Sequence, residues 1–298
     1  MENTNYNPAN YERATLADYG YKEHKALKTT WKVVSIALLI LSIFMLYLAI
    51  FIIAVQSFNS GEIPNEFESF TFKNYTEMFT RRQFNDAVRN TFLTSITATA
   101  VATVLGTLVG IGAFYLPPKA KQKLSFLNNI PLLNADIVTG ISLMLILMIF
   151  RLFIPNFFGF WTILIAHLYF ILPYVILSVL PKMKEIDPNM LEASLDLGVK
   201  PSKSLIKVLV PAVKGGIFSG MLLAFTISFE DFVVGYYTTG NGYNTLSIWV
   251  YSSIGKKSLF PGVYAFSTLL TFGMILGIVI FNLIKNMKGR IKNEKKAN

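Results

Sequence analysis

Six long apolar runs constrain the fold of this chain more than any other feature of its sequence. A helix needs about 20 predominantly apolar residues to cross a bilayer. The runs cover residues 33–55, 91–116, 134–150, 157–180, 213–235 and 262–284. The third is the weakest, because its uncharged part, 137–150, is short and must take in Asp136 or its flanks. The pattern predicts an all-α polytopic membrane protein with six transmembrane helices.

The composition supports a membrane protein and narrows its chemistry. Only 15% of the residues are charged and 53% are hydrophobic, whereas a soluble globular protein carries about 25% charged residues. The chain has no cysteine, which excludes disulfides and thiolate metal sites. A net charge of +10 can indicate nucleic acid binding, but here the basic residues are grouped between apolar runs. That grouping is typical of a cytoplasmic membrane face and argues for lipid rather than nucleic acid.

Lysine and arginine are distributed unequally between the two sides of the predicted spans. Five lie in the N-terminal tail up to Lys32, three in 119–123, five in 181–212 and six from Lys285 onward, against seven in the alternate loops. The positive-inside rule therefore predicts that both termini are cytoplasmic. The predicted organisation is a cytoplasmic tail (1–28), a transmembrane domain (29–288) with a cytoplasmic loop at 182–212, and a basic cytoplasmic tail (289–298).

The predicted cytoplasmic loop contains signals for two short helices. Asp187 before Pro188 is typical of a helix start, Gly198 suits a positive φ just past a helix end, and Pro201 and Pro211 bracket the second helix. The expected apolar faces are Met190, Leu191, Ala193, Leu195 and Leu197, then Leu205, Ile206, Val208 and Leu209. Such a rigid knob could enter a groove on a partner. An amphipathic hairpin on the lipid surface explains the pattern equally well.

The same loop carries a motif, E-A-S-x-x-x-G, nine residues, then V-x-V-P, which ends at Pro211. It resembles the EAA loop of ABC importer permeases, which reads E-A-A, three residues, G, nine residues and I-x-L-P. The departures are conservative: a serine for the second alanine, and valines for the isoleucine and leucine. The resemblance implies that Glu192, Ala193, Ser194, Gly198 and Pro211 couple this chain to an ATPase subunit.

The resemblance extends over roughly residues 90–284. The segments ADIVTGISLM, FWTILIAHLYFILPYVILSVL, LEASLDLG and SFEDFVVGYYTTG are similar to permeases of spermidine/putrescine importers, in particular the subunit type called C. This implies a type I ABC importer permease fold in the bacterial cell membrane. It also implies a second permease of similar fold, a dimer of ATP-binding subunits and an extracytoplasmic polyamine-binding protein. Related permeases handle sulfate, molybdate, iron or phosphonate, so the substrate stays open at this stage.

The sequence predicts that this chain is not itself an enzyme. An ATPase needs a phosphate-binding loop, G-x-x-x-x-G-K-[ST], and the nearest match, at 255–258, lacks the first glycine at the required spacing. We therefore expect no cofactor in this chain, with ATP and Mg²⁺ bound by the partner ATPase. A stand-alone secondary transporter or channel is a less favoured alternative. A membrane-embedded enzyme is more distant, because the sequence shows no catalytic constellation or metal-ligand cluster.

Glu230 and Asp231 form an acidic pair in the fifth run. A charge at the centre of a membrane helix costs about 2.5–3.5 kcal/mol on insertion scales, although a pair near the outer end could also reach water. On one continuous helix the two side chains would point about 100° apart, so one could face a pathway while the other pairs with a neighbouring helix. The resembling polyamine permeases also carry an acidic pair here, which suits a dication. We therefore predict that both acids contribute to a substrate pathway.

Other polar and small residues within the runs have two interpretations each. Asp136 is expected to cap the start of the third run, and a pathway acid is the compatible alternative. For His167, a hydrogen bond to a neighbouring helix is favoured over a proton relay or substrate contact.

Tyr236 and Tyr237 fit the aromatic wall of a cation pathway. Of three G-x-x-x-G pairs, beginning at residues 106, 216 and 273, we expect one or two to pack against another helix.

Overall fold

The computed structural model describes residues 25–61, 66–154, 157–187, 189–240, 242–254 and 260–297. Among these residues the regular elements are helices, with one isolated antiparallel bridge between Asn59 and Phe70. Most of the predicted N-terminal tail, Pro188 and the tetrapeptide at 255–258 lie outside the described residues. The chain divides into a central unit, Phe58–Phe266, and a terminal unit, Met1–Ser57 with Ser267–Asn298.

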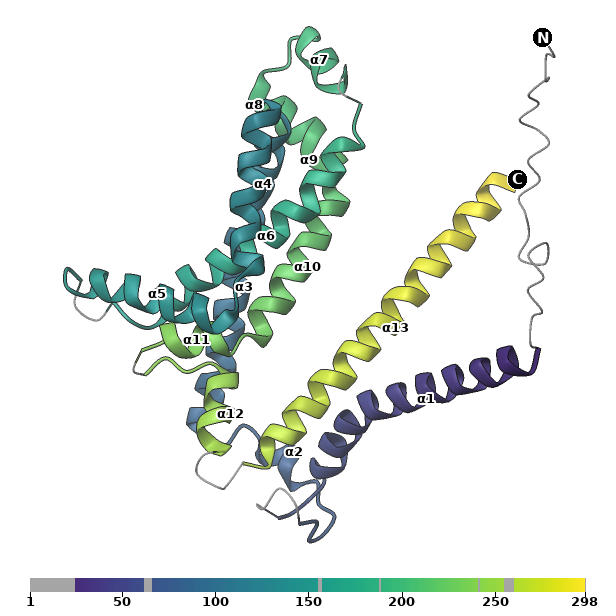
Figure 1. The fold of residues 1–298 in the computed structure, drawn as a ribbon, viewed down its shortest axis with the longest axis vertical. Coiled ribbons are helices and arrows are strands. Elements are labelled where there is room, and N and C mark those ends of the chain that lie inside the picture. The colour runs from purple at the N-terminus through teal and green to yellow at the C-terminus, as the bar shows by residue number, and fades with distance from the viewer. Residues whose placement is uncertain are drawn as a thin grey trace, which may run out of the picture. The chain divides into compact units, whose positions relative to one another are not determined.

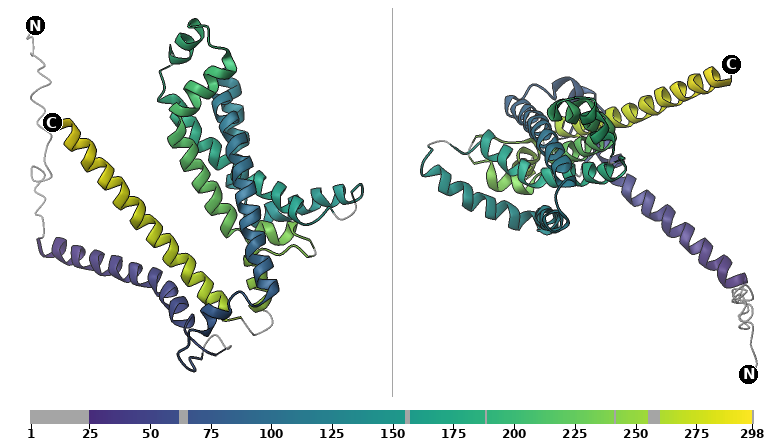
Figure 2. Two further views of the ribbon diagram at one scale, coloured as in Figure 1. Left: turned by 180° about the vertical axis from the view of Figure 1, so that it is seen from behind. Right: turned by 90° about the horizontal axis from the view of Figure 1, so that it is seen from above.

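Three helices form the bundle of the central unit: α3 (Arg82–Phe114), α6 (Phe160–Lys184) and α10 (Lys214–Glu230). They lie side by side, as Figures 1 and 2 show. Aliphatic side chains of α6, among them Val175 and Val179, are fully buried between them. Because lipid gives apolar helices little hydrophobic reason to associate, close packing has to hold the bundle together.

Two of the three glycine pairs supply that close packing. A Cβ atom built on Gly106 would lie 2.7 Å from Val175, and one on Gly216 would lie 2.6 Å from the carbonyl oxygen of Ser178. The second glycine of each pair approaches α6 with similar closeness. Gly273, in contrast, has no such neighbour within 4 Å. The first two pairs thus let α3 and α10 approach α6 with backbone nearly in contact.

Shorter helices surround the bundle. Helix α4 (Pro118–Leu133) and helix α5 (Asp136–Arg151) meet at a bend of 104°. Helix α11 (Val233–Thr238) packs beside α5, crosswise to the bundle (Figure 1). Helix α12 (Leu246–Ile254) and the single turn α2 (Lys73–Glu77) complete this part of the unit. The third predicted span is therefore realised as part of a sharply bent pair.

The fifth predicted span is broken. Helix α10 ends at Glu230, Asp231 has an extended backbone with φ −59° and ψ 131°, and α11 begins two residues later. The expectation of one helix running through Gly235 is therefore wrong, and so is the geometry in which the two acids diverge on a common helix. Before α10, the segment Pro201–Ala212 is bent from it by 73°.

The terminal unit contains α1 (Lys25–Gln56) and most of α13 (Gly262–Ala297), which leaves the central unit after Phe266. A small cavity of about 40 Å³ lies between them, lined by residues that include Ile50, Ala54 and Thr268. The apolar stretch of α1 buries no residue within the described chain.

By length and composition, three described helices can each cross a membrane: Thr30–Gln56 within α1, together with α3 and α6. The number rises to five if each bent pair is one span, and Gly262–Gly277 is a further, shorter apolar helix. The chain is thus an all-helical membrane protein. Its sixfold crossing and the side on which its termini lie remain predictions.

Candidate functional site: an acidic cavity at a helix break

A cavity of about 370 Å³ opens where α10 ends, and we name it the acidic cavity. Its lining comes from α4, the start of α5, α6, the end of α10 and the start of α11. Asp136, Glu230 and Asp231 all line it, and its described lining includes no lysine or arginine. The other lining residues are Pro131, Leu132, Asn134, Phe170, Tyr174, Ile227, Phe232, Val233 and Val234. The fold thus gathers three acids that lie up to 95 positions apart in the sequence.

Glu230 is the last residue of α10, and it is exposed. No described residue forms a hydrogen bond or an ion pair with its carboxylate. The C-terminus of a helix carries partial negative charge, so a carboxylate there is unfavourable by about 0.3–1 kcal/mol. A carboxylate at this helix end, in a cavity lined by two further acids, would be stabilised by a positive partner.

Asp231 has different surroundings. Its side chain is only 9% exposed, and both of its oxygens accept hydrogen bonds from the first turn of α11. The N–H of Gly235 donates to Oδ2 at 2.7 Å, and the N–H of Val234 donates to Oδ1 at 3.3 Å. Backbone donors at a helix start stabilise a buried carboxylate. Asp231 therefore caps α11 while its side chain borders the cavity.

His167 joins α6 to the helix break. It is 2% exposed; its Nδ1 lies 2.7 Å from the hydroxyl of Ser228, and its Nε2 lies 3.5 Å from Oδ2 of Asp231. The prediction of a hydrogen bond between His167 and a neighbouring helix is confirmed, with α10 as that helix. The contact to Asp231 lies beyond the usual 2.7–3.2 Å range of an N–H···O hydrogen bond.

Asp136 does not cap α5. The helix begins at Asp136 itself, the N-cap residue is Ala135, and no side chain caps this end. The expectation of a side-chain cap at Asp136 is therefore wrong, because the residue sits one position too late. Its carboxylate still lies in the first turn, where the helix dipole favours negative charge, and it lines the acidic cavity.

An aromatic cluster adjoins the acidic cavity. Phe232 lines the cavity, and its ring centroid lies 4.8 Å from Tyr251 and 5.6 Å from Tyr236. Tyr236 in turn contacts Tyr237 and Tyr251. Tyr236 itself does not line the cavity; it contacts Phe232, which does. The sequence did not single out Tyr251, because it lies on α12 and meets the others only in the folded chain.

The predicted cytoplasmic loop forms α7 (Asn189–Asp196), α8 (Pro201–Ser204), a π-helical turn (Leu205–Leu209) and α9 (Val210–Ala212). It lies at the end of the bundle opposite α12 (Figures 1 and 2). Gly198 has a φ of +77°, as expected for the residue after α7. The N–H of Gly198 donates to Leu195 and that of Val199 donates to Ser194, which completes a Schellman turn.

Ser194 is one of the positions at which this chain departs from the EAA motif, and its hydroxyl connects the two parts of the loop. Its hydroxyl donates to the carbonyl of Leu191 and pairs with the hydroxyl of Ser204, which is fully buried. The predicted apolar faces are only partly correct: Leu209 is buried, but Leu197 is 84% and Ile206 is 64% exposed. Exposed apolar side chains at this end of the unit are available to lipid or to a partner.

The end of the second loop helix also differs from expectation. The helical segment that begins at Pro201 continues past Pro211 to Ala212 and breaks only at Val213. Proline is tolerated near the start of α9, because its missing N–H is not needed there for a helical hydrogen bond. Glu192 and Ala193 are both exposed on α7. The residues of the motif that resembles the EAA loop therefore lie in one continuous loop. Ser194 is buried in this loop, and the two residues before it are exposed.

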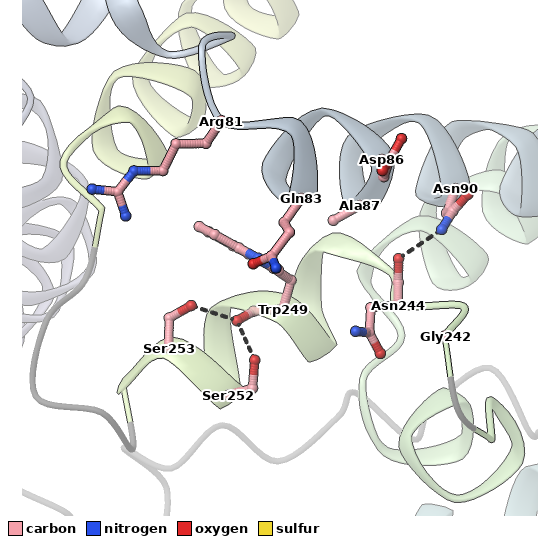
Figure 3. A pocket seen from close by; sticks show the side chains of 10 residues that line it. All are labelled: Arg81, Gln83, Asp86, Ala87, Asn90, Gly242, Asn244, Trp249, Ser252 and Ser253. Carbon is pink, nitrogen blue, oxygen red and sulfur yellow. Dashed lines mark hydrogen bonds between the residues drawn. The ribbon is translucent and has the colours of Figure 1, made fainter.

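A second cavity, of about 470 Å³, lies between the start of α3 and α12 (Figure 3). Within it Asn90 donates to the carbonyl of Asn244, and the hydroxyls of Ser252 and Ser253 both donate to the carbonyl of Trp249. The full lining is Arg81, Gln83, Asp86, Ala87, Asn90, Gly242, Asn244, Trp249, Ser252 and Ser253. This cavity, which we name the Trp249 cavity, is lined by one cationic side chain and one carboxylate side chain. Its charge therefore does not select one sign of solute. The sequence analysis missed it, because its two walls lie far apart in the chain.

Metal binding finds no support in the part of the chain that the structure describes. No group of three or more histidine or acidic side chains there is placed to hold a metal ion.

A helix broken beside acidic side chains in a membrane protein is typical of subunits that translocate solutes. Residues 120–290 match the family "Binding-protein-dependent transport system inner membrane component". The chain belongs to this family and is an ABC importer permease subunit, a class that is not enzymatic and works with a separate ATPase.

Individual relatives agree with this assignment. The chain is 30% identical to the spermidine/putrescine transport system permease protein PotC of Escherichia coli (strain K12) over 80% of this chain and 88% of that protein. It is 29% identical to the putrescine transport system permease protein PotI of the same strain, over 91% and 97%. A solved bacterial ABC transporter that imports the polysaccharide alginate shares the fold, with a TM-score of 0.60 at 14% identity, covering 90% of this chain and 98% of that one.

Proposed function

We propose that this chain forms half of the translocation pathway of an ATP-driven importer for polyamines such as spermidine and putrescine. The observation that carries the proposal is the acidic cavity, where Asp136, Glu230 and Asp231 converge without a described lysine or arginine. The relatives whose names include spermidine or putrescine support the same substrate class. Sulfate, molybdate or phosphonate would instead meet like charge.

The energetics favour a cation. An ammonium group 4 Å from a carboxylate gains about 4 kcal/mol at an effective dielectric constant of about 20, and an anion would lose as much. A polyamine carries several ammonium groups separated by methylenes, which suits acids distributed over one cavity. The ring of Phe232, which lines the cavity, is a cation–π partner worth about 0.5–1 kcal/mol when exposed and about 2 kcal/mol when desolvated.

The loop from Glu192 to Pro211 is the proposed coupling element. It is compact because of the Schellman turn and the Ser194–Ser204 contact, yet it presents exposed Glu192 and Leu197. In this proposal the loop occupies a cleft of an ATP-binding subunit, and closure of the ATPase dimer on ATP and Mg²⁺ moves the loop with it. That movement switches access to the pathway from one side of the membrane to the other.

The remaining partners follow from the same proposal. A second permease of similar fold supplies the other half of the pathway, and an extracytoplasmic binding protein delivers the polyamine. The chain lies in the bacterial cell membrane with both termini in the cytoplasm. The substrate crosses at the interface between the two permeases.

Uptake of labelled putrescine and spermidine, in a strain carrying the whole operon, tests the proposal. We expect saturable uptake that is lost when this gene is deleted. In the purified complex, spermidine should stimulate ATP hydrolysis and sulfate should not; the reverse result would assign the importer to an anion. Transport that survives replacement of both Glu192 and Gly198, without any ATPase partner, would identify a self-sufficient transporter instead.

A further inference from the structure

His167 is a buried polar residue that the proposed pathway does not use directly. It lies in the middle of α6, is 2% exposed and is absent from the described lining of the acidic cavity. Nevertheless its two ring nitrogens approach Ser228 and Asp231, which stand on either side of Glu230. One buried ring thus spans the point where α10 ends.

The two contacts fix the arrangement of the imidazole ring. In the tautomer in which Ser228 donates its hydroxyl to Nδ1, the ring proton is on Nε2, and that N–H points toward the carboxylate of Asp231. Nε2 has no hydrogen-bond partner within the described residues. A buried donor without an acceptor costs about 1–3 kcal/mol, so this donor favours conformations in which Asp231 stays close.

Asp231 is in turn fixed to α11. Because Oδ2 accepts from the N–H of Gly235 at 2.7 Å, anything that holds Asp231 also holds the start of α11. Ser228, one turn back, belongs to α10 and is itself buried. His167 therefore connects the last turn of α10 to the first turn of α11. Glu230 lies on the short stretch between these two anchors, exposed to the cavity.

We propose that His167 is a positioning residue for the acidic cavity: through its hydrogen bond to Ser228 and its Nε2 facing Asp231 at 3.5 Å, it sets where Glu230 is presented to the cation. It acts on substrate through these residues and does not touch it. The nature of the cation rests on the proposed function, but the placement of Glu230 does not.

Two isosteric variants separate the two contacts of the ring. The amide of glutamine reaches the place of Nε2, whereas that of asparagine reaches the place of Nδ1. His167→Gln therefore retains a donor toward Asp231, and His167→Asn retains only a partner for Ser228. Both variants leave a polar side chain in the same buried site; because asparagine is one methylene shorter than glutamine, membrane abundance and Vmax report any loss of packing separately from KM.

The first measurement is polyamine uptake in cells that carry the whole operon and full-length chain. We expect His167→Asn to raise the apparent KM roughly fivefold, the size of one hydrogen-bond interaction, at unchanged Vmax and membrane abundance. His167→Gln should recover most of that loss. An equal fall in abundance and Vmax for both variants, with KM unchanged, would show that His167 is only a packing residue.

The second measurement does not depend on transport. The chain has no native cysteine, so Glu230→Cys gives it a single thiol whose reaction with a cationic methanethiosulfonate reagent can be followed by mass. His167→Asn should change that rate severalfold, and His167→Gln should restore it. Ser252→Cys, in the Trp249 cavity, is the control. Its thiol should react at the same rate in chains that carry His167, His167→Asn or His167→Gln.

The two measurements distinguish the two hypotheses. If the wild-type operon takes up no polyamine but the Glu230→Cys rates respond as expected, the proposed substrate fails and the role of His167 stands. If the thiol rates are the same in all three backgrounds, the positioning role is wrong whatever the substrate is.

Discussion

Glu230 and Asp231 are neighbours in the sequence, yet the structure gives their carboxylates different surroundings. Asp231 accepts two backbone hydrogen bonds and borders His167, whereas Glu230 is exposed, with no described partner. The break after α10 produces this difference, because only a non-helical Asp231 can turn back to cap α11. We infer that Glu230 is the acid of the pair more available to a cation.

Removing the charge of Glu230 should weaken transport without disturbing the fold. For Glu230→Gln we expect an apparent KM for polyamine about tenfold higher, equivalent to about 1.4 kcal/mol, because the cavity loses its unpartnered carboxylate. Initial uptake rates measure this, with membrane abundance checked by immunoblot. Glu77→Gln is the control, since Glu77 is a surface residue whose ion pair among the described residues is with Lys73, at 3.7 Å. A wild-type KM for Glu230→Gln would remove Glu230 from the pathway.

Asp231 should matter to stability as well as to transport. Asp231→Ala deletes the acceptor for two N–H groups of α11 and should lower the free energy of unfolding by about 1 kcal/mol. Asp231→Asn keeps an acceptor oxygen and should lose less. Thermal denaturation of the solubilised complex compares the two, with Glu230→Ala as a control that should be close to wild type. Equal stability of Asp231→Ala and Asp231→Asn would contradict the capping role.

Among the elements, α6 is the helix on which the central unit is built. Helices α3 and α10 approach it through glycine pairs, and its His167 reaches the break between α10 and α11. In lipid such contacts depend on how closely two backbones can approach. Small residues therefore hold the bundle together, while the polar ones determine where the cavity opens.

A methyl group on Gly216 should disturb this packing. Its Cβ would lie 2.6 Å from the carbonyl oxygen of Ser178, and overpacking of this kind costs about 1–3 kcal/mol. We expect Gly216→Ala to lower the abundance and the melting temperature of the complex. Gly273→Ala, whose Cβ meets no atom of the described residues within 4 Å, should lower neither. Equal effects of the two changes would contradict the assignment of Gly216 as a packing site.

A substitution at Gly198 tests whether the backbone conformation of the loop is needed for coupling. A Cβ there would meet nothing within 4 Å, but the φ of +77° is unfavourable for alanine by about 1–2 kcal/mol. Gly198→Ala should therefore reduce co-purification of the ATP-binding subunit and uptake. Gly198→Asn should reduce them less, because asparagine tolerates this conformation. If both variants retain full co-purification, the turn is not needed for coupling.

At the scale of the whole molecule, the position of the acidic cavity relative to the membrane decides how it can work. The loop that contains α7 lies at one end of the central unit, and α12 lies at the other (Figure 1). If the termini are cytoplasmic, as the distribution of lysine and arginine predicts, the loop faces the ATPase and α12 faces the outside. The acidic cavity then lies in the broken region between them.

The absence of native cysteine makes this orientation directly measurable. Ser252→Cys on α12 and Ser202→Cys on α8 both replace exposed residues. In intact cells an impermeant thiol reagent should label the chain at position 252 and leave position 202 unmodified until the cells are permeabilised. The opposite pattern would invert the predicted topology and place the proposed coupling loop on the wrong side for an ATPase.

The amino-acid sequence by itself determined the class of this protein. Long apolar runs can be satisfied in lipid only as helices, because each backbone donor and acceptor then finds its partner within the run. The Gly198 turn was also predictable, since its conformation depends on residues close in the chain. The same holds for the glycine pairs, whose spacing places both members on one face of a helix.

Only the tertiary structure decided how the polar residues of the runs meet. Apolar periodicity does not reveal that α10 stops at Glu230, because the sequence stays apolar on both sides of the acids. The structure places His167 beside the residues at the break, and it brings Asp136 to the acidic cavity and Tyr251 to the ring of Phe232. Such long-range pairings have no local signature, since their energy comes from burial and hydrogen bonds that exist only once the helices have packed.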